Sequence, residues 1–292
     1  MTPASTLLVR TGLIGAGIGG SFSPALHEAE AAAQGVDLSY SLFDTDLDSR
    51  PLGEVLSTAS AAGFAGVNIT HPYKQAVLDE IDELAGDARA VGAVNTVRFE
   101  AGRRIGHNTD ASGYAEAFRR QMPGADTARV LQCGAGGAGS AVAHAQLEAG
   151  VGHLVLHDPD PVRRQALVSD LRARFGAHRV SEAGPDLVAE LAMSTGLVNA
   201  SPVGMLAHPG LPVPREGLHT GLWVSDVVYM PVETALLRAA RDRGLPTLSG
   251  VHMCVHQAAA AFEIFTGRSP DVERMSARLG RLLGEREDTA DA

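Results

Sequence analysis

Short apolar runs alternate with longer amphipathic stretches along most of the chain, which is the hydrophobic pattern of an α/β protein. Compact apolar runs predict strands, and apolar residues spaced three and four apart predict helices. The predicted strands lie at residues 7–14, 38–43, 64–69, 95–99, 104–107, 130–133, 154–156, 197–198 and 223–228. The predicted helices lie at residues 23–33, 52–62, 112–120, 140–149, 163–175, 236–243 and 251–265.

The clearest pattern is a βαβ unit in the middle of the chain. Its first strand stops at a glycine cluster in which Gly134, Gly136 and Gly139 have G-x-G-x-x-G spacing, and its second strand is followed by Asp158. In this context the glycines permit a tight turn and let backbone N–H groups approach a pyrophosphate. The helix N-terminus favours the phosphate charge by roughly 0.3–2 kcal/mol. The unit therefore predicts a dinucleotide-binding domain.

A second glycine-rich loop, residues 15–20, follows the first predicted strand. It resembles another nucleotide fingerprint, but no adequate helix starts directly after it. The helix is expected to begin with Ser23 as N-cap and Pro24 in the first turn. Ser21 and Ser23 then lie on a loop at a helix N-terminus, although capping alone would explain Ser23.

Polar residues also follow the third strand and the predicted hairpin. Pro72 is expected to open a helix, so that Thr70 and Lys74 flank a strand-to-helix turn. The hairpin leads into the segment Asn-Thr-Asp at residues 108–110. Turn chemistry alone would explain the asparagines and threonines in both places.

Composition narrows the possible partners. A chain of 292 residues suits about two domains of roughly 150 residues each. The net charge of −10, without a dense cluster of basic residues, argues against nucleic acid and anionic membranes. The apolar stretches are shorter than the roughly 20 residues of a membrane helix, and the N-terminus does not resemble a secretory signal. We expect a cytoplasmic protein that acts on small molecules, as a monomer or a homodimer.

A metal site is not expected. Cys133 and Cys254 have neither metal-ligand spacing nor a disulfide framework. His252 and His256 are four residues apart on a predicted helix, but Met253 replaces the glutamate of an HExxH motif and no third ligand is evident.

Taken together, these segments resemble the shikimate/quinate dehydrogenase family over nearly the whole chain. The matching motifs lie at residues 21–24, 68–74, 92–96, 108–110, 134–139, 199–205, 226–231 and 250–257. The resemblance implies two α/β lobes, a substrate-binding domain and a Rossmann dinucleotide-binding domain, with the active site in the cleft between them. The implied bounds are 1–111 for the first part of the substrate domain, 112–248 for the NAD-binding domain and 249–292 for the C-terminal helices of the substrate domain.

The resemblance also implies a role for each matching residue. Lys74 and Asp110 correspond to the catalytic pair. Residues implied in substrate binding are Ser21 and Ser23 for the carboxylate, Asn68, Thr70, Asn95 and Gln257 for the ring hydroxyls, and Tyr229 in the cleft. Residues implied in cofactor binding are Gly134, Gly136, Gly137, Ala138, Gly139, Asp158, Asn199, Val228 and Gly250.

The cofactor is expected to be NAD, with NADP less favoured. NADP-using members of the family typically carry Asn-Arg-Thr after the second nucleotide strand, whereas this chain carries Asp158, Pro159 and Asp160. A 2′-phosphate would be repelled by these acids, an effect that Arg163 and Arg164 could soften.

The implied reaction is the NAD-dependent interconversion of shikimate and 3-dehydroshikimate, and also of quinate and 3-dehydroquinate. Ser23 leaves more room than a threonine would for the extra hydroxyl of quinate. Alternatives are a relative acting on aminoshikimate or aminoquinate in a secondary pathway, a folate-type methylene dehydrogenase, and a non-catalytic NAD-binding sensor. Lys74 and Asp110 argue against the sensor, which would need neither, and the serine pair argues against folate.

Overall fold

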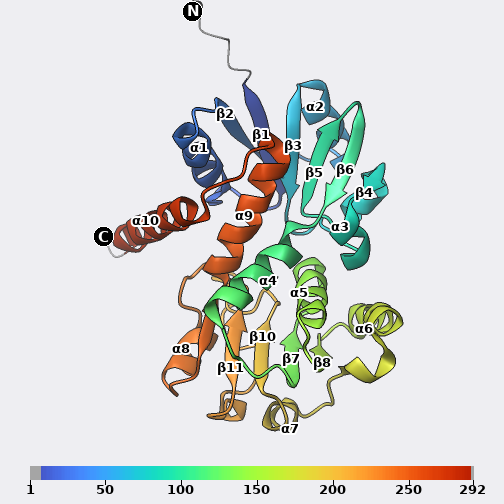
Figure 1. Cartoon of the computed structure of the whole chain (residues 1–292), viewed down its shortest axis with the longest axis vertical. Coiled ribbons are helices and arrows are strands. Elements are labelled where there is room, and N and C mark those ends of the chain that lie inside the picture. The colour runs from blue at the N-terminus through green and yellow to red at the C-terminus, as the bar shows by residue number, and fades with distance from the viewer. Residues whose placement is uncertain (1–7, 291–292) are drawn as a thin grey trace, which may run out of the picture. The chain divides into compact units, whose positions relative to one another are not determined.

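The computed structural model describes residues 8–290, apart from the side chains of residues 87 and 286–290, and the predicted α/β architecture is confirmed (Figure 1). Residues 110–254 form one compact unit, here called the central unit, and the segments on either side form the flanking unit. The domain bounds expected from the sequence, 1–111, 112–248 and 249–292, remain a prediction. No helix within the described residues is long and apolar enough to span a membrane.

The sheet of the flanking unit combines parallel and antiparallel strands in the order β2-β1-β3-β5-β6-β4. Its strands are β1 (Val9–Gly15), β2 (Leu38–Asp44), β3 (Phe64–Ile69), β4 (Glu83–Leu84), β5 (Thr96–Glu100) and β6 (Arg103–His107). β1 pairs in parallel with β2 and β3, and β5 and β6 form the predicted hairpin. Ala101 and Gly102 make its turn with φ angles of +49° and +77°, as short hairpin turns require. Ile14, Leu56 and Val67 are fully buried in the core of this unit.

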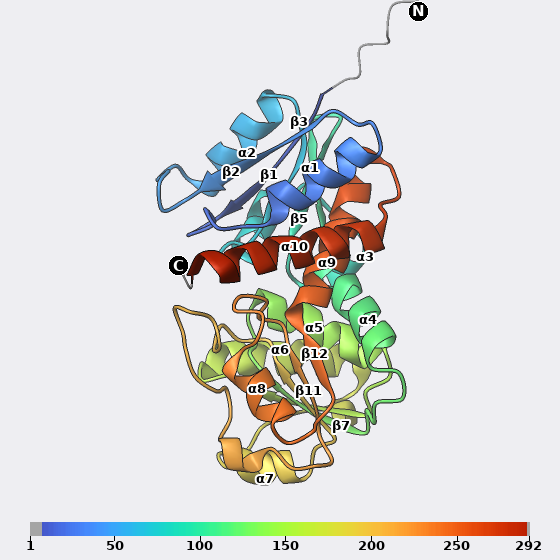
Figure 2. The same ribbon diagram turned by 90° about the vertical axis from the view of Figure 1, so that its left-hand side faces the viewer.

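The helices of the flanking unit come from both ends of the chain. They are α1 (Ser23–Ala33), α2 (Leu52–Ala61), the 3₁₀ turn η1 (Ala76–Glu80), α3 (Gly86–Val91), most of α9 (Gly250–Thr266) and α10 (Val272–Ala290). α10 packs beside α1 (Figure 2). The side chain of Glu30 in α1 is fully buried at this contact and accepts hydrogen bonds from Arg274 Nη2 at 2.7 Å and Nε at 2.8 Å. The backbone N–H of Asp271 donates to the same carboxylate at 2.9 Å.

The central unit is a doubly wound parallel sheet. Its strands are β7 (Arg129–Cys133), β8 (His153–His157), β9 (Val180–Glu182), β10 (Gly196–Asn199), β11 (Trp223–Asp226) and β12 (Thr247–Ser249). The order β12-β11-β10-β7-β8-β9 reverses between β7 and β10, which is where ligands bind in sheets of this type. Its helices are α4 (Thr109–Gln121), whose first residue belongs to the flanking unit, α5 (Gly137–Glu148), α6 (Pro161–Phe175), α7 (Leu187–Ala192) and α8 (Ala235–Arg241). Because helices cover both faces, Leu131, Val155 and Leu197 are completely buried.

Several helix starts differ from those predicted. Phe22, not Ser23, is the N-cap of α1, and Ser23 is its first residue. α4 begins at Thr109 rather than at residue 112, because the side chain of Asn95 accepts the first backbone N–H. No helix opens at Pro72, since the carbonyl of Lys74 is bonded to Val94 N instead of continuing a helix, and only η1 follows. Strands β4, β9 and β12 and helices α3 and α7 were not predicted, and α10 was expected only as one of the C-terminal helices that the resemblance implies. Of the predicted strand at 7–14, residue 7 lies outside the described residues.

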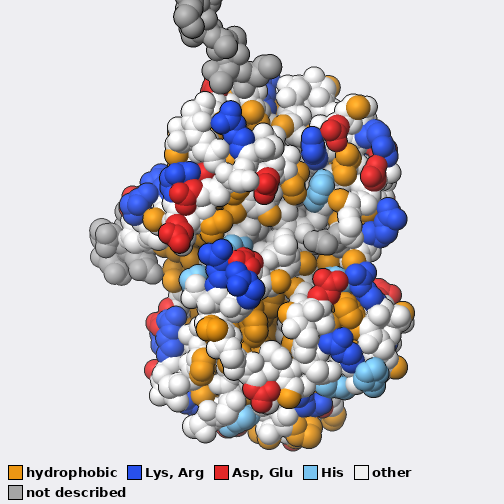
Figure 3. All heavy atoms as spheres, viewed as in Figure 1, with side chains coloured by type: hydrophobic (Ala, Val, Ile, Leu, Met, Phe, Trp, Pro, Cys, Tyr) orange, Lys and Arg blue, Asp and Glu red, His pale blue; other side chains and the backbone are white. Residues whose placement is uncertain are grey.

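The surface carries charges of both signs. On the face shown in Figure 3, Lys and Arg side chains are interspersed with Asp and Glu. Many of these charges pair locally, for example Arg119 and Arg120 with Glu116 along α4.

The Glu30–Arg274 pair should contribute measurably to stability. Removing the arginine charge leaves a buried carboxylate without its main partner, which costs several kcal/mol when water cannot replace it. Because the Arg274 side chain is 41% exposed, we expect Arg274→Gln to lower the free energy of unfolding by roughly 2–4 kcal/mol. Urea unfolding measures the change. Arg281→Gln, on an exposed position of the same helix, is the matched control, and equal small effects of the two variants would contradict the prediction.

Candidate active site

The glycine loop between β7 and α5 has the shape that its spacing predicts. Gly134 has a φ of +105°, and a Cβ atom added there would lie 2.5 Å from the carbonyl oxygen of Ala200. A Cβ on Gly139 would overlap the carbonyl oxygen of Gly134. Gly136 is the N-cap of α5, without a side-chain cap, and a Cβ there would meet no atom within 4 Å. The space and N–H groups at this helix start fit the pyrophosphate of a dinucleotide.

Gln132 holds this loop, a role the sequence analysis missed. Its fully buried side chain donates from Nε2 to the carbonyls of Gly134 at 2.9 Å and Gly139 at 2.8 Å. Its Oε1 accepts a 2.7 Å hydrogen bond from Gln146 in α5. The only sequence signal for this role is a polar residue inside a run that is otherwise apolar.

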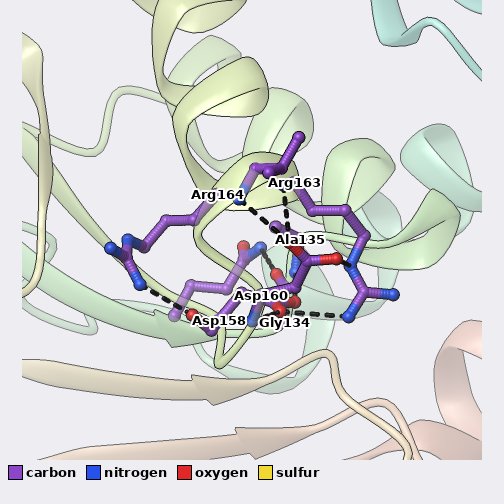
Figure 4. A network of polar contacts seen from close by, with 8 residues as sticks. Gly134, Ala135, Asp158, Asp160, Arg163 and Arg164 are labelled. Carbon is purple, nitrogen blue, oxygen red and sulfur yellow. Dashed lines mark hydrogen bonds and ion pairs between the residues drawn. The ribbon is translucent and has the colours of Figure 1, made fainter.

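Asp158, the first residue after β8, also contacts the glycine loop. The residue is 4% exposed, and its Oδ2 accepts a hydrogen bond from Ala135 N at 2.8 Å (Figure 4). Its Oδ1 accepts from Asp160 N at 2.9 Å and lies 3.2 Å from Arg163 Nη2. This carboxylate therefore fixes the loop and stands at the place from which an acid binds a ribose in NAD-type folds.

The two arginines near Asp158 are both engaged by acids. The Nε atom of Arg163 also lies 3.4 Å from Asp160 Oδ2. Arg164 donates to the backbone carbonyl of Asp158 at 2.8 Å and to Glu182 at 2.7 Å. Three carboxylates thus face two guanidinium groups, which leaves this region with a net negative charge.

The ends of β10 and β11 are joined by a buried polar pair. Asn199 Nδ2 donates to Asp226 Oδ1 at 2.9 Å and to the carbonyl of Val203 at 2.8 Å, and its Oδ1 accepts from Ser201 Oγ at 2.6 Å and Ser201 N at 3.2 Å. The Asn199 amide is therefore used within the protein to shape the loop after β10.

Asp226 organises the loop after β11. Its Oδ1 also accepts from Val228 N at 3.0 Å, and its Oδ2 accepts from Thr234 Oγ1 at 2.7 Å. Nearby, a Cβ on Gly250 would overlap the carbonyl of Val227, so only glycine fits there. Val228 is buried and Tyr229 is half-buried.

In the flanking unit, the loop 15–20 does not present its N–H groups to a ligand. The Asp44 carboxylate accepts hydrogen bonds from Gly17 N and Ile18 N, both at 3.0 Å. These bonds, with one from Asp46 N as the largest influence, lower the pKa of Asp44. The loop therefore serves to orient the segment that carries Ser21 and the start of α1.

Ser21 and Ser23 lie together at the N-terminus of α1. The two hydroxyl oxygens are 3.2 Å apart, and Ser21 Oγ also accepts from Ser23 N at 3.2 Å. Two rotatable hydroxyls at a helix N-terminus can bind a carboxylate without an arginine.

Asn68 and Asn95 lie together in the same unit. Both are buried, and the Oγ1 atom of Thr96 lies 2.9 Å from Asn68 Nδ2 and 3.1 Å from Asn95 Oδ1. Thr70 and Lys74, both half-buried, follow β3.

The remaining predicted residues lie on helices. Asp110 is buried in the first turn of α4, and Gln257 is half-buried in α9. Lys74 belongs to the flanking unit and Asp110 to the central unit, so their pairing stays a prediction. Within the described residues, no group of three His, Cys, Asp or Glu side chains is arranged to hold a metal ion.

Known proteins and solved structures resemble this chain over nearly its whole length. Residues 13–97 match the family model described as Shikimate dehydrogenase substrate binding domain, and residues 250–279 match Shikimate 5'-dehydrogenase C-terminal domain. The chain is 52% identical to a shikimate dehydrogenase (NADP(+)) of Streptomyces avermitilis, over 94% of this chain and 95% of the relative. It is 48% identical to a quinate/shikimate dehydrogenase (NAD(+)) of Corynebacterium efficiens, over 91% and 95%. Among solved structures, the quinate dehydrogenase from Corynebacterium glutamicum in complex with NAD matches with a TM-score of 0.88 at 44% identity, covering 93% of this chain and 98% of that one.

Asp226 should make stability depend on pH. Burial raises its pKa from 3.8 to about 6, against hydrogen bonds from Thr234, Val228 and Asn199 that lower it. Because the folded state holds this proton more tightly than the unfolded state, the stabilising contribution is full below the unfolded value of about 4 and is lost as pH rises through about 6.

Asp226→Asn, which has no charge to bury, should therefore gain stability relative to the unmodified protein as pH rises from 4 to 7, by about 2 kcal/mol. Urea unfolding at several pH values measures this difference. Asp170→Asn, at an exposed position of α6, controls for general charge effects. A difference between Asp226→Asn and the unmodified protein that does not change with pH would show that Asp226 is not the group responsible.

Proposed function

The chain belongs to the shikimate dehydrogenase family, and we propose that it is an NAD-preferring member that oxidises both shikimate and quinate. The resemblance inferred from the motifs is confirmed by the relatives, as is the activity of a shikimate/quinate dehydrogenase that uses a nicotinamide dinucleotide. The observation that carries the proposal is the match to an NAD-type quinate/shikimate dehydrogenase over 91% of this chain, together with the acidic residue after β8. The cytoplasmic location and the oligomeric state stay predictions.

We assign the proton transfer to Lys74. When bound, the nicotinamide exchanges a hydride with the ring carbon that carries the reacting oxygen. Lys74 takes the hydroxyl proton during oxidation and returns it during reduction, and Asp110 stabilises its charged form. Because an amine must lose its proton before it acts as a base, oxidation should be faster at alkaline pH.

Composition supports this assignment. Lys74 is the only lysine in the sequence, whereas arginine occupies the other 23 basic positions counted as Lys or Arg. An arginine side chain keeps its proton in proteins, so it can bind a carboxylate but cannot act as a base. A chain that otherwise uses arginine retains an amine at the one position where a group must release a proton.

The residues that would bind the substrate carboxylate and ring hydroxyls lie in the flanking unit. Ser21 and Ser23 would bind the carboxylate, and the amides of Asn68 and Asn95 would bind ring hydroxyls. A site built on paired hydroxyl contacts rejects analogues that lack one, because a buried polar group is then left unpaired. The small Ser23 leaves room beside the carboxylate for the additional hydroxyl of quinate.

The geometry around Asp158 supports NAD over NADP. A 2′-phosphate would approach a buried carboxylate, and Arg163 would have to leave Asp158 and Asp160 to bind it. Arg164 is held by Glu182 and by the Asp158 carbonyl. The two relatives described above use different cofactors, so this preference has to be measured on this protein.

Steady-state rates with each substrate and each cofactor test the proposal. We expect turnover of shikimate and quinate, and a kcat/KM for NAD at least roughly tenfold above that for NADP, about 1.4 kcal/mol. Asp158→Asn keeps an oxygen for the Ala135 N–H but removes the charge, so it should lower the ratio of kcat/KM for NAD to kcat/KM for NADP. Equal or better kcat/KM with NADP would refute NAD preference, and absence of quinate turnover would restrict the enzyme to shikimate. If neither substrate reacts, an aminoshikimate-type substrate is the next to test.

Two substitutions of Lys74 separate proton transfer from charge. Lys74→Ala should lower kcat by roughly 10²–10⁴, the usual contribution of a general acid/base, while NAD binding is retained. Lys74→Arg keeps the positive charge but cannot release a proton, so it should lose activity to a similar extent. An active Lys74→Arg variant would reduce Lys74 to an electrostatic role. Since Lys74 is the only lysine, reductive methylation with ¹³C-formaldehyde labels only this amine and the N-terminus, and NMR can follow its titration directly.

A further inference from the structure

Five buried side chains of the flanking unit form a continuous hydrogen-bonded chain. They are Tyr40 (7% exposed), Asn68 (7%), Thr96 (0%), Asn95 (3%) and Thr109 (3%). The joining distances are 2.8 Å from Tyr40 OH to Asn68 Oδ1, 2.9 Å from Asn68 Nδ2 to Thr96 Oγ1, 3.1 Å from Thr96 Oγ1 to Asn95 Oδ1 and 2.8 Å from Asn95 Nδ2 to Thr109 Oγ1. Thr109 immediately precedes Asp110, so the chain ends at the first turn of α4.

The direction of this chain is set by a backbone group. Thr109 N–H can only donate, and it donates to Asn95 Oδ1 at 2.8 Å, which fixes the orientation of the Asn95 amide. The Thr96 hydroxyl, facing the same oxygen, must then donate to it and accept from Asn68 Nδ2. Asn68 Oδ1 is thereby turned toward the hydroxyl of Tyr40. Each amide has one orientation that satisfies the whole chain.

This arrangement leaves a specific pair of groups for a ligand. Asn95 Nδ2 uses one hydrogen on Thr109 and retains the second as a donor. Asn68 Nδ2 uses both hydrogens, on Thr96 and on the Asn95 carbonyl at 3.3 Å. Asn68 Oδ1 accepts from Tyr40 and retains a second lone pair as an acceptor. A flip of either amide would exchange donor for acceptor.

We propose that Thr96 is a positioning residue for substrate binding, because its hydroxyl joins Asn68 to Asn95, whose own amide is oriented by Thr109 N–H. The link holds the pair in the orientation that offers one donor and one acceptor to the ring hydroxyls. Thr96 is completely buried and acts through these two amides, and the Tyr40 hydroxyl fixes the far end. The inference rests on the proposed function, in which both amides bind the substrate ring.

Thr96→Val tests this with little change in shape, since it replaces the hydroxyl by a methyl group. Asn68 Nδ2 then loses its shorter hydrogen bond and Asn95 Oδ1 loses one of its donors, while Thr109 still orients Asn95. Because Asn68 is no longer tied to Asn95 through the hydroxyl, we expect KM for shikimate to rise roughly tenfold or more. The Kd for NAD should stay within about twofold, because the cofactor residues lie in the central unit. Thr96→Ser restores the hydroxyl and should return KM to within about threefold of the unmodified enzyme.

Thr11→Val is the matched control. Thr11 is also completely buried in the sheet of the flanking unit, and its hydroxyl bonds only loosely to the carbonyl of Ser39 at 3.4 Å. The Thr11→Val variant should lower the midpoint temperature of thermal unfolding without raising KM for shikimate. An unchanged KM in folded Thr96→Val, or an equal rise of KM in Thr11→Val, would overturn the proposal.

Tyr40→Phe provides a second route if Thr96→Val does not fold. It removes the donor to Asn68 Oδ1 and keeps the ring that packs against His27 at 4.9 Å between centroids. KM for shikimate should rise several-fold, and an unchanged KM would also overturn the proposal. The activity of the unmodified enzyme distinguishes a failure of the proposed function from a failure of this inference. If it fails to oxidise shikimate, the proposed function falls and this inference with it, whereas normal activity with an unaltered Thr96→Val refutes the inference alone.

Discussion

Buried and half-buried side-chain amides and carboxylates hold the loops that follow several strands, and the placement of the glycine loop, the serine pair and the start of α4 depends on them. Such loops carry backbone N–H and C=O groups into the interior, where an unpaired group costs about 1–3 kcal/mol. In the central unit, Gln132 pairs with two carbonyls of the glycine loop, and Asn199 and Asp226 pair with the loops after β10 and β11. In the flanking unit, Asp44 binds the loop after β1, and Asn95 binds the start of α4.

Because of this constraint, the residues that the sequence assigned to ligand binding fall into two groups: those whose side chains are used within the protein, and those that keep a hydrogen-bonding position for a ligand. All four hydrogen-bonding positions of the Asn199 amide are used within the protein, so its side chain shapes the cofactor loop. Asn68 and Asn95 use most of their hydrogen-bonding positions within the protein, and each keeps one: an acceptor on Asn68 Oδ1 and a donor on Asn95 Nδ2. Ser21 and Ser23 bond mainly to one another and can rotate toward a carboxylate. The residues that contact a substrate and the residues that orient them are therefore neighbours in one network, and matching a motif does not separate them.

Hydrophobic periodicity predicted the α/β class, the hairpin and most of the longer helices because each of these buries a regular apolar face, but it did not predict α10, which has 19 residues. The short strands β9 and β12 and the helix α7 were missed since they contain too few residues to show a period. Helix starts were wrong where the cap comes from a distant residue, as Asn95 caps Thr109. The glycine spacing revealed the dinucleotide loop, but Gln132, which holds that loop, had no motif. Pairings such as Glu30 with Arg274, 244 residues apart, depend on tertiary packing that local patterns do not contain.

Under the proposed NAD preference, Asp158 combines two roles that chemistry can separate. The Ala135 N–H requires an oxygen acceptor at position 158, whereas the interaction with Arg163 and the repulsion of a 2′-phosphate require a negative charge. An asparagine would keep the acceptor and lose the charge. The family pattern noted above, in which NADP-using members typically carry Asn-Arg-Thr here, fits this separation. Under this proposal, the glycine loop can keep one shape in both kinds of enzyme, while cofactor choice changes with the charge beside it.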